Sequence, residues 1–208
     1  MTGHFIVIEG LEGAGKSSAV ATIEACLEAA NKPFIKVREP GGTPFAEALR
    51  ELIKQPWRET VGAEAELMVM YAARVQLVRN VIQPALAKGT WVIGDRHDMS
   101  SQAYQGGGRA LDSRVLDTLK QLSLGRFAPN LTIYLDISPE LGLQRAKGRG
   151  ELDRIEQEDL QFFQRTRARY QTLVAADPTA HLVDASQPMA QVQDEVRRIV
   201  VEYLRQQL

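Results

Sequence analysis

The sequence has little cysteine, little net charge and no long apolar run. Its one cysteine, Cys26, excludes a disulfide framework and a Cys-based zinc cluster, and its place in a helical pattern suggests a small core residue. The 25 Lys and Arg residues against 26 Asp and Glu leave a formal net charge of -1. A broad basic surface for nucleic acid is therefore not expected.

No apolar stretch approaches the length of a membrane span, and the first residues, MTGHFIVIEG, lack the basic start and cleavage site of a signal peptide. We therefore expect a cytoplasmic protein that does not bind a membrane. The 208 residues, 44% of them apolar, suit one domain with one sizeable core. The expected domain is residues 1–208, with no linker or repeat dividing it.

Short apolar runs rich in Ile, Val, Phe and Tyr alternate with helical periodicity. The expected strands are Phe5–Glu9, Phe34–Val37, Trp91–Gly94, Leu131–Asp136 and His181–Asp184. The expected helices are Ser17–Ala30, Phe45–Ile53, Ala63–Lys88, Asp112–Gly125, Pro139–Ala146, Asp159–Ala176 and Pro188–Gln206. This alternation predicts an α/β fold, in which helices cover both faces of a five-stranded parallel sheet. Ligands then bind beyond the carboxyl ends of the strands.

Three segments depart from the regular pattern. Pro84 should kink the long third helix or mark its last turns. Gln105–Arg109, reading QGGGR, is expected to be a loop because three successive glycines disfavour a helix interior. Arg145–Arg154 holds four basic residues and two glycines, which suits either a solvated helix end or a mobile lid over phosphates.

The most specific motif is GLEGAGKS, which matches GxxxxGK[ST] and lies between an expected strand and an expected helix. Its glycines let backbone N–H groups surround an anion, and the following helix adds its N-terminal dipole. Lys16 can reach the β- and γ-phosphates, and the Ser17 hydroxyl can bind Mg²⁺. The expected ATP-binding residues are Gly10, Leu11, Glu12, Gly13, Ala14, Gly15, Lys16, Ser17 and Ser18.

The motif alone does not distinguish the classes of P-loop protein. The only Asn-Lys pair, Asn31-Lys32, lacks the aspartate of a guanine-reading NKxD segment. The third strand ends in Asp95-Arg96 and not in the acidic pair typical of motor and helicase ATPases. Asp95 can hold Mg²⁺ or its waters, while Arg96 indicates an anionic second substrate. These features favour a small kinase.

Further arginines support a phosphorylated acceptor. Arg38 follows the second strand, Arg96 follows the third, and Arg74 lies on the long helix. Arginine makes bidentate contacts with phosphate, and an uncharged nucleoside would give two converging arginines nothing to neutralise.

The combination of GLEGAGKS, REPGGT, YAAR, GDRHD, AYQGGGR and GRGELDRIE resembles the bacterial thymidylate kinases that carry a basic lid. The resemblance covers essentially the whole chain. It implies a P-loop nucleoside-monophosphate-kinase fold, transfer of the γ-phosphate of ATP to dTMP with Mg²⁺, and a homodimer formed through long helices.

The resemblance also assigns roles to individual residues. It implies that Glu12 accepts the deoxyribose 3′-hydroxyl and that Asp95 is the carboxylate on the magnesium side. The expected dTMP-binding residues are Glu12, Arg38, Arg50, Met70, Arg74, Arg96, Ser101, Tyr104 and Gln105. Within this set, Arg38 and Arg96 would clamp the phosphate, Arg74 and Gln105 would read the thymine edge, and the Tyr104 ring would pack where a ribose carries its 2′-hydroxyl.

In relatives with this lid, an arginine closes over the transferring phosphoryl group. Arg149 and Arg154 are the candidates, followed by Arg145, whereas Lys147 would make a weaker clamp. The expected catalytic residues are Lys16, Asp95, Arg96, Arg149 and Arg154. The sequence departs from many relatives at Met70, which stands where they have a phenylalanine on the thymine ring, so base selectivity is the property this change affects.

Two alternatives to a dTMP kinase stay open at this point. One is a P-loop kinase of another nucleotide or of a deoxynucleoside. The other is a nucleotide-binding regulatory module, which the intact Lys16, Ser17 and Asp95 disfavour. His97 follows Asp95-Arg96 and is expected to be a packing residue, or one that supports residues of the site, and not a general base.

Overall fold

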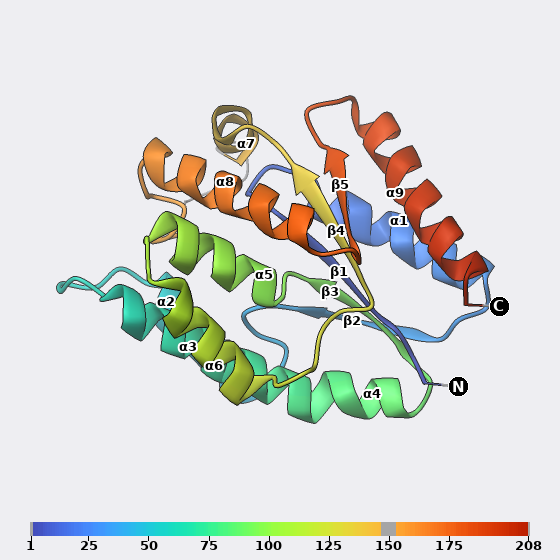
Figure 1. The fold of residues 1–208 in the computed structure, drawn as a ribbon, viewed down its shortest axis with the longest axis horizontal. Helices are drawn as coiled ribbons and strands as arrows, with labels where there is room; N and C mark the ends of the chain where they lie inside the picture. Colours follow the sequence, from blue (N-terminus) through green and yellow to red (C-terminus); the bar gives the residue numbers. More distant parts are fainter. Residues whose placement is uncertain (1, 147–152, 208) are drawn as a thin grey trace.

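The computed structural model describes residues 2–146 and 153–207, which form a five-stranded parallel sheet between two layers of helices (Figure 1). The strands lie in the order β2-β3-β1-β4-β5. They are β1 (Phe5–Gly10), β2 (Phe34–Arg38), β3 (Trp91–Asp95), β4 (Leu131–Asp136) and β5 (Ala180–Asp184). The five predicted strands are confirmed, each within one residue at either end.

The helices follow the predicted alternation. They are α1 (Lys16–Ala29), α2 (Pro44–Lys54), α3 (Ala63–Leu77), the π-helical turn η1 (Val78–Ile82), α4 (Gln83–Ala87), α5 (Asp98–Ser101), the π-helix η2 (Gln102–Gly108), α6 (Ser113–Ser123), α7 (Pro139–Ala146), α8 (Leu160–Ala176) and α9 (Met189–Arg205). Ser138 accepts a hydrogen bond from Leu141 N at the start of α7, where Pro139 needs no donor.

The central strand β1 is buried on both faces because side chains alternate across a strand. Ile6 and Ile8 pack in one core with residues of α1 and α9, whereas Phe5 and Val7 pack in another with residues of α3 and η1. Figure 1 shows α1 and α9 together on one face of the sheet and α3 and α4 on the other. Cys26 lies in the first core, as predicted.

The prediction of one helix over Ala63–Lys88 is correct in extent but not in regularity. The chain stays helical from Ala63 to Ala87, but the π-helical turn η1 interrupts it and ends two residues before Pro84. Pro84 lies in the first turn of α4, inside this continuous helical stretch, where a proline is a usual cause of an irregular turn. The expected disturbance around Pro84 is therefore confirmed and takes the form of a π-turn.

The prediction of a loop over Gln105–Arg109 is wrong, because residues 102–108 form the π-helix η2. Two of its glycines, Gly107 and Gly108, allow close approach to α8. A Cβ atom on Gly107 would lie 2.6 Å from the Arg169 Cβ atom, and one on Gly108 would lie 2.5 Å from the Phe162 ring. Packing against α8 therefore outweighs the low helical propensity of glycine.

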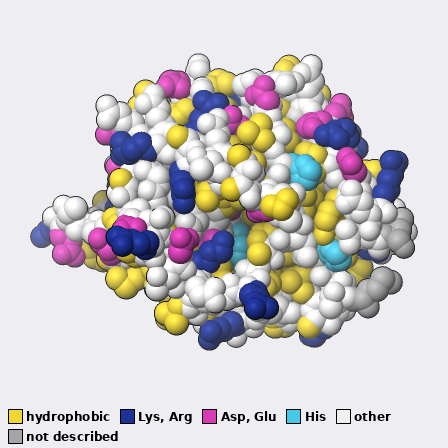
Figure 2. Space-filling model, in the orientation of Figure 1, with side chains coloured by type: hydrophobic (Ala, Val, Ile, Leu, Met, Phe, Trp, Pro, Cys, Tyr) yellow, Lys and Arg dark blue, Asp and Glu magenta, His cyan; other side chains and the backbone are white. Residues whose placement is uncertain are grey.

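The surface carries charges of both signs. On the face in Figure 2, Lys and Arg side chains are interspersed with Asp and Glu side chains. This distribution agrees with the formal net charge of -1. Across the described ranges, no helix is both long enough and apolar enough to span a membrane.

Candidate active site

The loop after β1 has the backbone expected of an anion-binding loop. Gly13 and Gly15 adopt φ values of 77° and 94°, a left-handed region that favours glycine. A Cβ atom on Gly13 would also lie 2.1 Å from the Gly142 carbonyl oxygen, so the loop passes directly against α7. Helix α1 begins at Lys16 with no side chain capping its N-terminus, which leaves its first N–H groups for a ligand.

Lys16 is buried at the base of this loop. Its Nζ atom donates to the carbonyl oxygens of Gly10 at 3.2 Å and Leu11 at 3.0 Å, and lies 3.7 Å from the Glu12 carboxylate. Burial, together with repulsion from Arg96, lowers the pKa of Lys16 to about 8. Polyphosphate oxygens would supply the missing negative charge and favour the ammonium form.

Asp95 ends β3 next to the strand that leads into the phosphate loop, since β1 and β3 are paired. Its Oδ1 atom is buried and has no hydrogen-bond partner among the residues that the structure describes. A buried, unpartnered carboxylate oxygen fits a cation or its waters. The described residues contain no group of three or more His, Cys, Asp or Glu side chains that could hold a metal ion by themselves. Mg²⁺ does not need one, because it commonly takes one or two protein ligands plus substrate phosphates.

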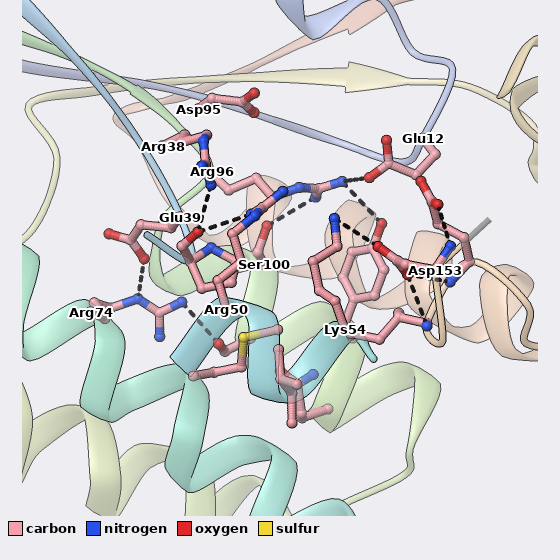
Figure 3. A pocket seen from close by; sticks show the side chains of 18 of the residues that line it. Glu12, Arg38, Glu39, Arg50, Lys54, Arg74, Asp95, Arg96, Ser100 and Asp153 are labelled. Atoms are coloured by element: carbon pink, nitrogen blue, oxygen red, sulfur yellow. Dashed lines mark hydrogen bonds and ion pairs between the residues drawn. The ribbon is translucent and has the colours of Figure 1, made fainter. Parts of the chain in front are cut away.

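Arg96 lies in the centre of the pocket in Figure 3 and connects its two ends. One nitrogen, Nη2, donates to the Glu12 carboxylate and to the Tyr104 hydroxyl at 3.3 Å. The other, Nη1, donates to the Ser100 hydroxyl at 3.1 Å, and the guanidinium lies 5.2 Å from the centre of the Tyr104 ring. Arg96 itself has a positive φ of 71°, a conformation uncommon for a side chain with a Cβ atom.

Two more arginines lie at the rim of the same pocket, beside the turn after β2. Arg38 and Arg50 both donate to the Pro40 carbonyl oxygen, at 3.1 and 2.9 Å. Arg38 also pairs with Glu47 at 2.8 Å. Burial and repulsion from Arg38 lower the pKa of Arg50, so the two guanidiniums leave a positive charge that an anion would neutralise.

The side of the pocket away from Glu12 holds a buried donor, on Arg74 (Figure 3), and a buried acceptor, on Gln105. Arg74 donates to Glu39 at 2.6 Å and to Ser101 Oγ at 2.9 Å, while Gln105 donates to Glu66 at 2.8 Å. Within the part of the chain that the structure describes, Arg74 Nη1 and Gln105 Oε1 have no hydrogen-bond partner. Both residues and Met70 line the pocket. The pair therefore matches a ligand edge that offers one acceptor and one donor.

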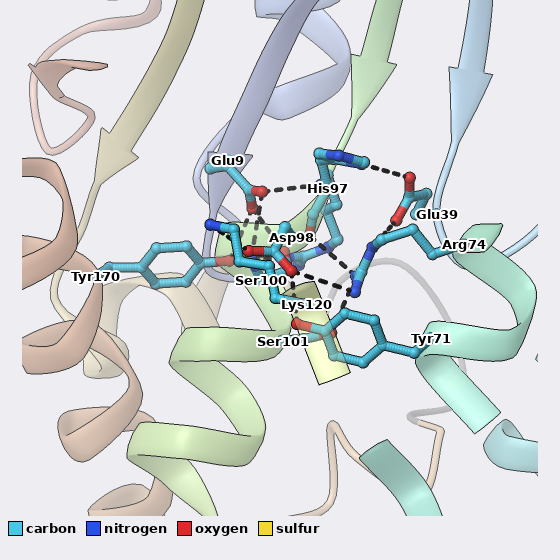
Figure 4. A network of polar contacts seen from close by, with 11 residues as sticks. Glu9, Glu39, Tyr71, Arg74, His97, Asp98, Ser100, Ser101, Lys120 and Tyr170 are labelled. Atoms are coloured by element: carbon cyan, nitrogen blue, oxygen red, sulfur yellow. Dashed lines mark hydrogen bonds and ion pairs between the residues drawn. The ribbon is translucent and has the colours of Figure 1, made fainter. Parts of the chain in front are cut away.

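Figure 4 shows a polar network behind these residues that sequence reasoning missed. Glu9 is fully buried and accepts hydrogen bonds from the backbone of His97, from Ser100 and from Tyr170. Its burial raises its pKa. The signal in the sequence was a carboxylate in the apolar run FIVIEG, where an acid is expensive unless it has partners.

His97 has the predicted supporting role. It is buried, and its Nδ1 atom lies 2.7 Å from Glu39 Oε1, while Glu39 also binds Arg74. Burial tends to raise the pKa of Glu39, but His97 and Arg74 outweigh it and hold the pKa below its ordinary value. His97 therefore helps to fix the carboxylate that orients Arg74.

The candidate lid is only partly within the described residues. Arg149 and Lys147 lie outside them. Arg154 donates through Nε to the Ile53 carbonyl oxygen at 3.0 Å and through Nη2 to Glu66, and Arg145 donates to the Ala185 carbonyl oxygen at 2.9 Å. In this conformation Arg154 anchors the segment before α8 to α3, and its role over a phosphoryl group stays a prediction.

The pocket brings together most of the predicted site. The predicted residues that line it are Glu12, Lys16, Arg38, Arg50, Met70, Arg74, Asp95, Arg96, Ser101, Tyr104 and Gln105. Ser17 is exposed, and Ser18 is partly buried, at the start of α1. Residues absent from the prediction also line the pocket, notably Glu39, Lys54 and Asp153, of which the last two form an ion pair of 2.9 Å.

Comparisons with known proteins give the family to which the chain belongs. Residues 8–196 match the family described as thymidylate kinase. The thymidylate kinase of Idiomarina loihiensis is 56% identical over 204 residues, which cover 98% of this chain and 100% of the relative. The thymidylate kinase of Alteromonas mediterranea is 54% identical over 208 residues, which cover 100% of this chain and 94% of the relative. The chain belongs to the thymidylate kinase family.

Proposed function

We propose that this chain transfers the γ-phosphoryl group of ATP to dTMP and produces dTDP for DNA precursor synthesis. Family membership supports the reaction. The observation that carries the choice of acceptor is the pocket itself, where Arg96 lies between the phosphate loop and the polar atoms of Arg74 and Gln105 that lack a hydrogen-bond partner among the described residues. The Arg96 guanidinium suits the phosphate of the acceptor, and the polar atoms of Arg74 and Gln105 suit a pyrimidine edge.

At the ATP end, the loop from Gly10 to Ser18 binds the triphosphate through its backbone, and Lys16 contacts the β- and γ-phosphates. Ser17 and Asp95 hold Mg²⁺, a role that the unpartnered Asp95 oxygen supports. When bound, the ion neutralises charge on the β- and γ-phosphates. Catalysis then depends on positioning and charge stabilisation, because phosphoryl transfer needs no covalent enzyme intermediate.

At the dTMP phosphate, Arg96 and Arg38 supply the positive charge, with Arg50 alongside. Arg96 already holds Glu12, so the carboxylate is oriented to accept the deoxyribose 3′-hydroxyl. The Tyr104 ring lies against the Arg96 guanidinium and fills the space where a ribose would place its 2′-hydroxyl. That hydroxyl would lose hydration against an apolar ring edge, which disfavours ribonucleotides.

At the base, Arg74 Nη1 donates to thymine O4, and Gln105 Oε1 accepts from thymine N3–H. Ser101 keeps Arg74 in place through its hydrogen bond of 2.9 Å. Met70 packs against the ring with an adaptable thioether, so the pocket keeps its reaction but has an altered shape.

We also propose that Arg149 and Arg154 close over the transferring group, which requires Arg154 to leave Glu66. An arginine at that position contributes roughly 4–7 kcal/mol to the transition state. The chain works as one kinase domain of residues 1–208 in the cytoplasm, with soluble nucleotides as its substrates. A homodimer through the long helices is supported by Met68 on α3 and Val115 on α6, which are 57% and 40% exposed and line one groove.

A coupled assay of ADP release tests the reaction. ATP and Mg²⁺ are supplied with dTMP, dUMP, dCMP, dGMP, AMP or thymidine. The proposal predicts strong turnover with dTMP, weak turnover with dUMP and none with thymidine. A preference for another acceptor would refute the base assignment, and no release with any acceptor would favour a regulatory nucleotide-binding module.

A further inference from the structure

Glu66 is a buried carboxylate that the reaction described above does not use. It lies on α3, is 0% exposed and is not part of the pocket lining. Even so, it contacts a residue of the pocket, because its Oε1 atom accepts from Gln105 Nε2 at 2.8 Å. Because Glu66 binds the Gln105 amide on the side away from the pocket, it can determine whether the oxygen or the nitrogen of that amide faces the base.

Arg109 keeps Glu66 ionised, and in this conformation Arg154 joins it. Arg109 donates to Oε1 at 3.2 Å and to Oε2 at 3.1 Å, and Arg154 donates to Oε2. Burial tends to raise the pKa of Glu66, but hydrogen bonds from Arg109 and Gln105 outweigh it and hold the pKa below its ordinary value. An ionised carboxylate can only accept hydrogen bonds. The amide nitrogen of Gln105 must therefore face Glu66.

That constraint fixes the opposite side of the amide. With the nitrogen against Glu66, Gln105 presents its Oε1 atom on the other side, and this oxygen has no partner within residues 2–146 and 153–207. Gln105 is only 1% exposed, so water does not compete freely for the oxygen. A turned amide would place oxygen against carboxylate, which costs both the hydrogen bond and an electrostatic repulsion.

We propose that Glu66 is a specificity-determining positioning residue, which locks the Gln105 amide with its oxygen toward the base and so selects a base that carries a proton on N3. The inference rests on the proposed function and extends it to the choice between pyrimidines. Thymine and uracil carry N3–H, whereas N3 of cytosine is an acceptor. Cytosine would therefore place an acceptor against an acceptor, an arrangement that buried sites reject strongly.

The variant Glu66→Gln tests the lock. Its carbonyl oxygen should take the place of Oε2, where two arginines donate, which leaves its NH₂ group facing Gln105. The Gln105 amide then gains by turning, so that its own NH₂ group faces the base. We expect the ratio of kcat/KM for dTMP to kcat/KM for dCMP to fall about tenfold. Arg74 Nη1 still opposes the cytosine amino group, so selectivity is reduced and not lost.

A matched control separates this effect from charge loss around Arg109. Glu158 also pairs with Arg109 but, among the described residues, forms no hydrogen bond with Gln105, so Glu158→Gln should keep the wild-type ratio. Any change that Glu66→Gln causes through Arg154 affects the turnover of dTMP and of dCMP equally, so it cancels in the ratio of their kcat/KM values. In a Gln105→Ala background, adding Glu66→Gln should leave the ratio unchanged, because no amide remains to turn.

An unchanged ratio in Glu66→Gln, or an equal fall in the Gln105→Ala background, overturns the inference while dTMP kinase activity stands. Failure of the wild-type chain to phosphorylate dTMP overturns the proposed function instead. The wild-type chain also allows a test without a Glu66 variant, which serves if that variant does not fold. The side-chain ¹⁵NH₂ signal of Gln105, assigned by its loss in Gln105→Ala, should exchange slowly with water both in the free protein and with dTMP bound, because its donors stay on Glu66. Fast exchange in either state refutes the locked amide.

Discussion

The low pKa of Lys16 predicts that ATP binding weakens at alkaline pH. Burial and Arg96 lower that pKa to about 8 in the free protein, whereas bound phosphates favour the charged ammonium. A group whose pKa rises on binding takes up a proton, so affinity falls as the pH passes the pKa of the free protein. Lys16 should therefore be charged and ready at neutral pH and largely neutral at alkaline pH.

The magnitude follows from the fraction of charged Lys16. With a pKa of about 8, this fraction is about three-quarters at about pH 7.5 and about one-tenth at about pH 9. The Kd for ATP should therefore rise about eightfold over this interval, equivalent to about 1.2 kcal/mol. At the upper pH, binding should take up close to one proton per ATP.

Isothermal titration calorimetry in buffers of different ionisation enthalpy measures both the Kd and the proton uptake. The variant Lys16→Arg is the control, because its guanidinium does not titrate over this interval. An affinity that is flat across the interval, or that falls equally in Lys16→Arg, would show that Lys16 is not the titrating phosphate ligand.

Three further predictions concern other parts of the molecule. Asp95→Asn should raise the Mg²⁺ concentration needed for half-maximal turnover at least about tenfold, and an unchanged Mg²⁺ titration would remove Asp95 from the metal site. Tyr104→Ala should raise turnover of the ribonucleotide TMP relative to dTMP, and unchanged discrimination would mean that another residue excludes the 2′-hydroxyl. Gly107→Ala should lower the free energy of unfolding by about 1–3 kcal/mol, because its Cβ atom would meet α8 at 2.6 Å. Gly106→Ala, whose Cβ atom would lie 3.3 Å from Leu116, is the milder control, and equal losses in urea unfolding would refute the packing explanation.

The sheet and the phosphate loop were predictable because their signals are local. Apolar runs such as Phe5–Gly10 mark buried parallel strands, and GLEGAGKS follows directly from the first of them. The convergence of Arg38, Asp95 and Arg96 also followed from topology, since the carboxyl ends of parallel strands share one edge of the sheet.

The polar network and η2 were not predictable from local pattern. Glu9, Ser100 and Tyr170 are far apart in sequence, and only the folded chain shows that they share hydrogen bonds. The glycines of η2 indicated a loop, because nothing near them shows that α8 lies against their Cα atoms. Glu66 escaped attention for the same reason, since its partner Gln105 lies 39 residues away.

The central claim is that the γ-phosphoryl group of ATP passes to dTMP in this site. A ³¹P NMR time course with ATP, Mg²⁺ and dTMP follows both products directly in one sample. The account predicts that dTDP and ADP accumulate in equal amounts and that neither forms when thymidine replaces dTMP. Accumulation of ADP and inorganic phosphate without dTDP would contradict it, because the site would then hydrolyse ATP and not transfer its phosphoryl group.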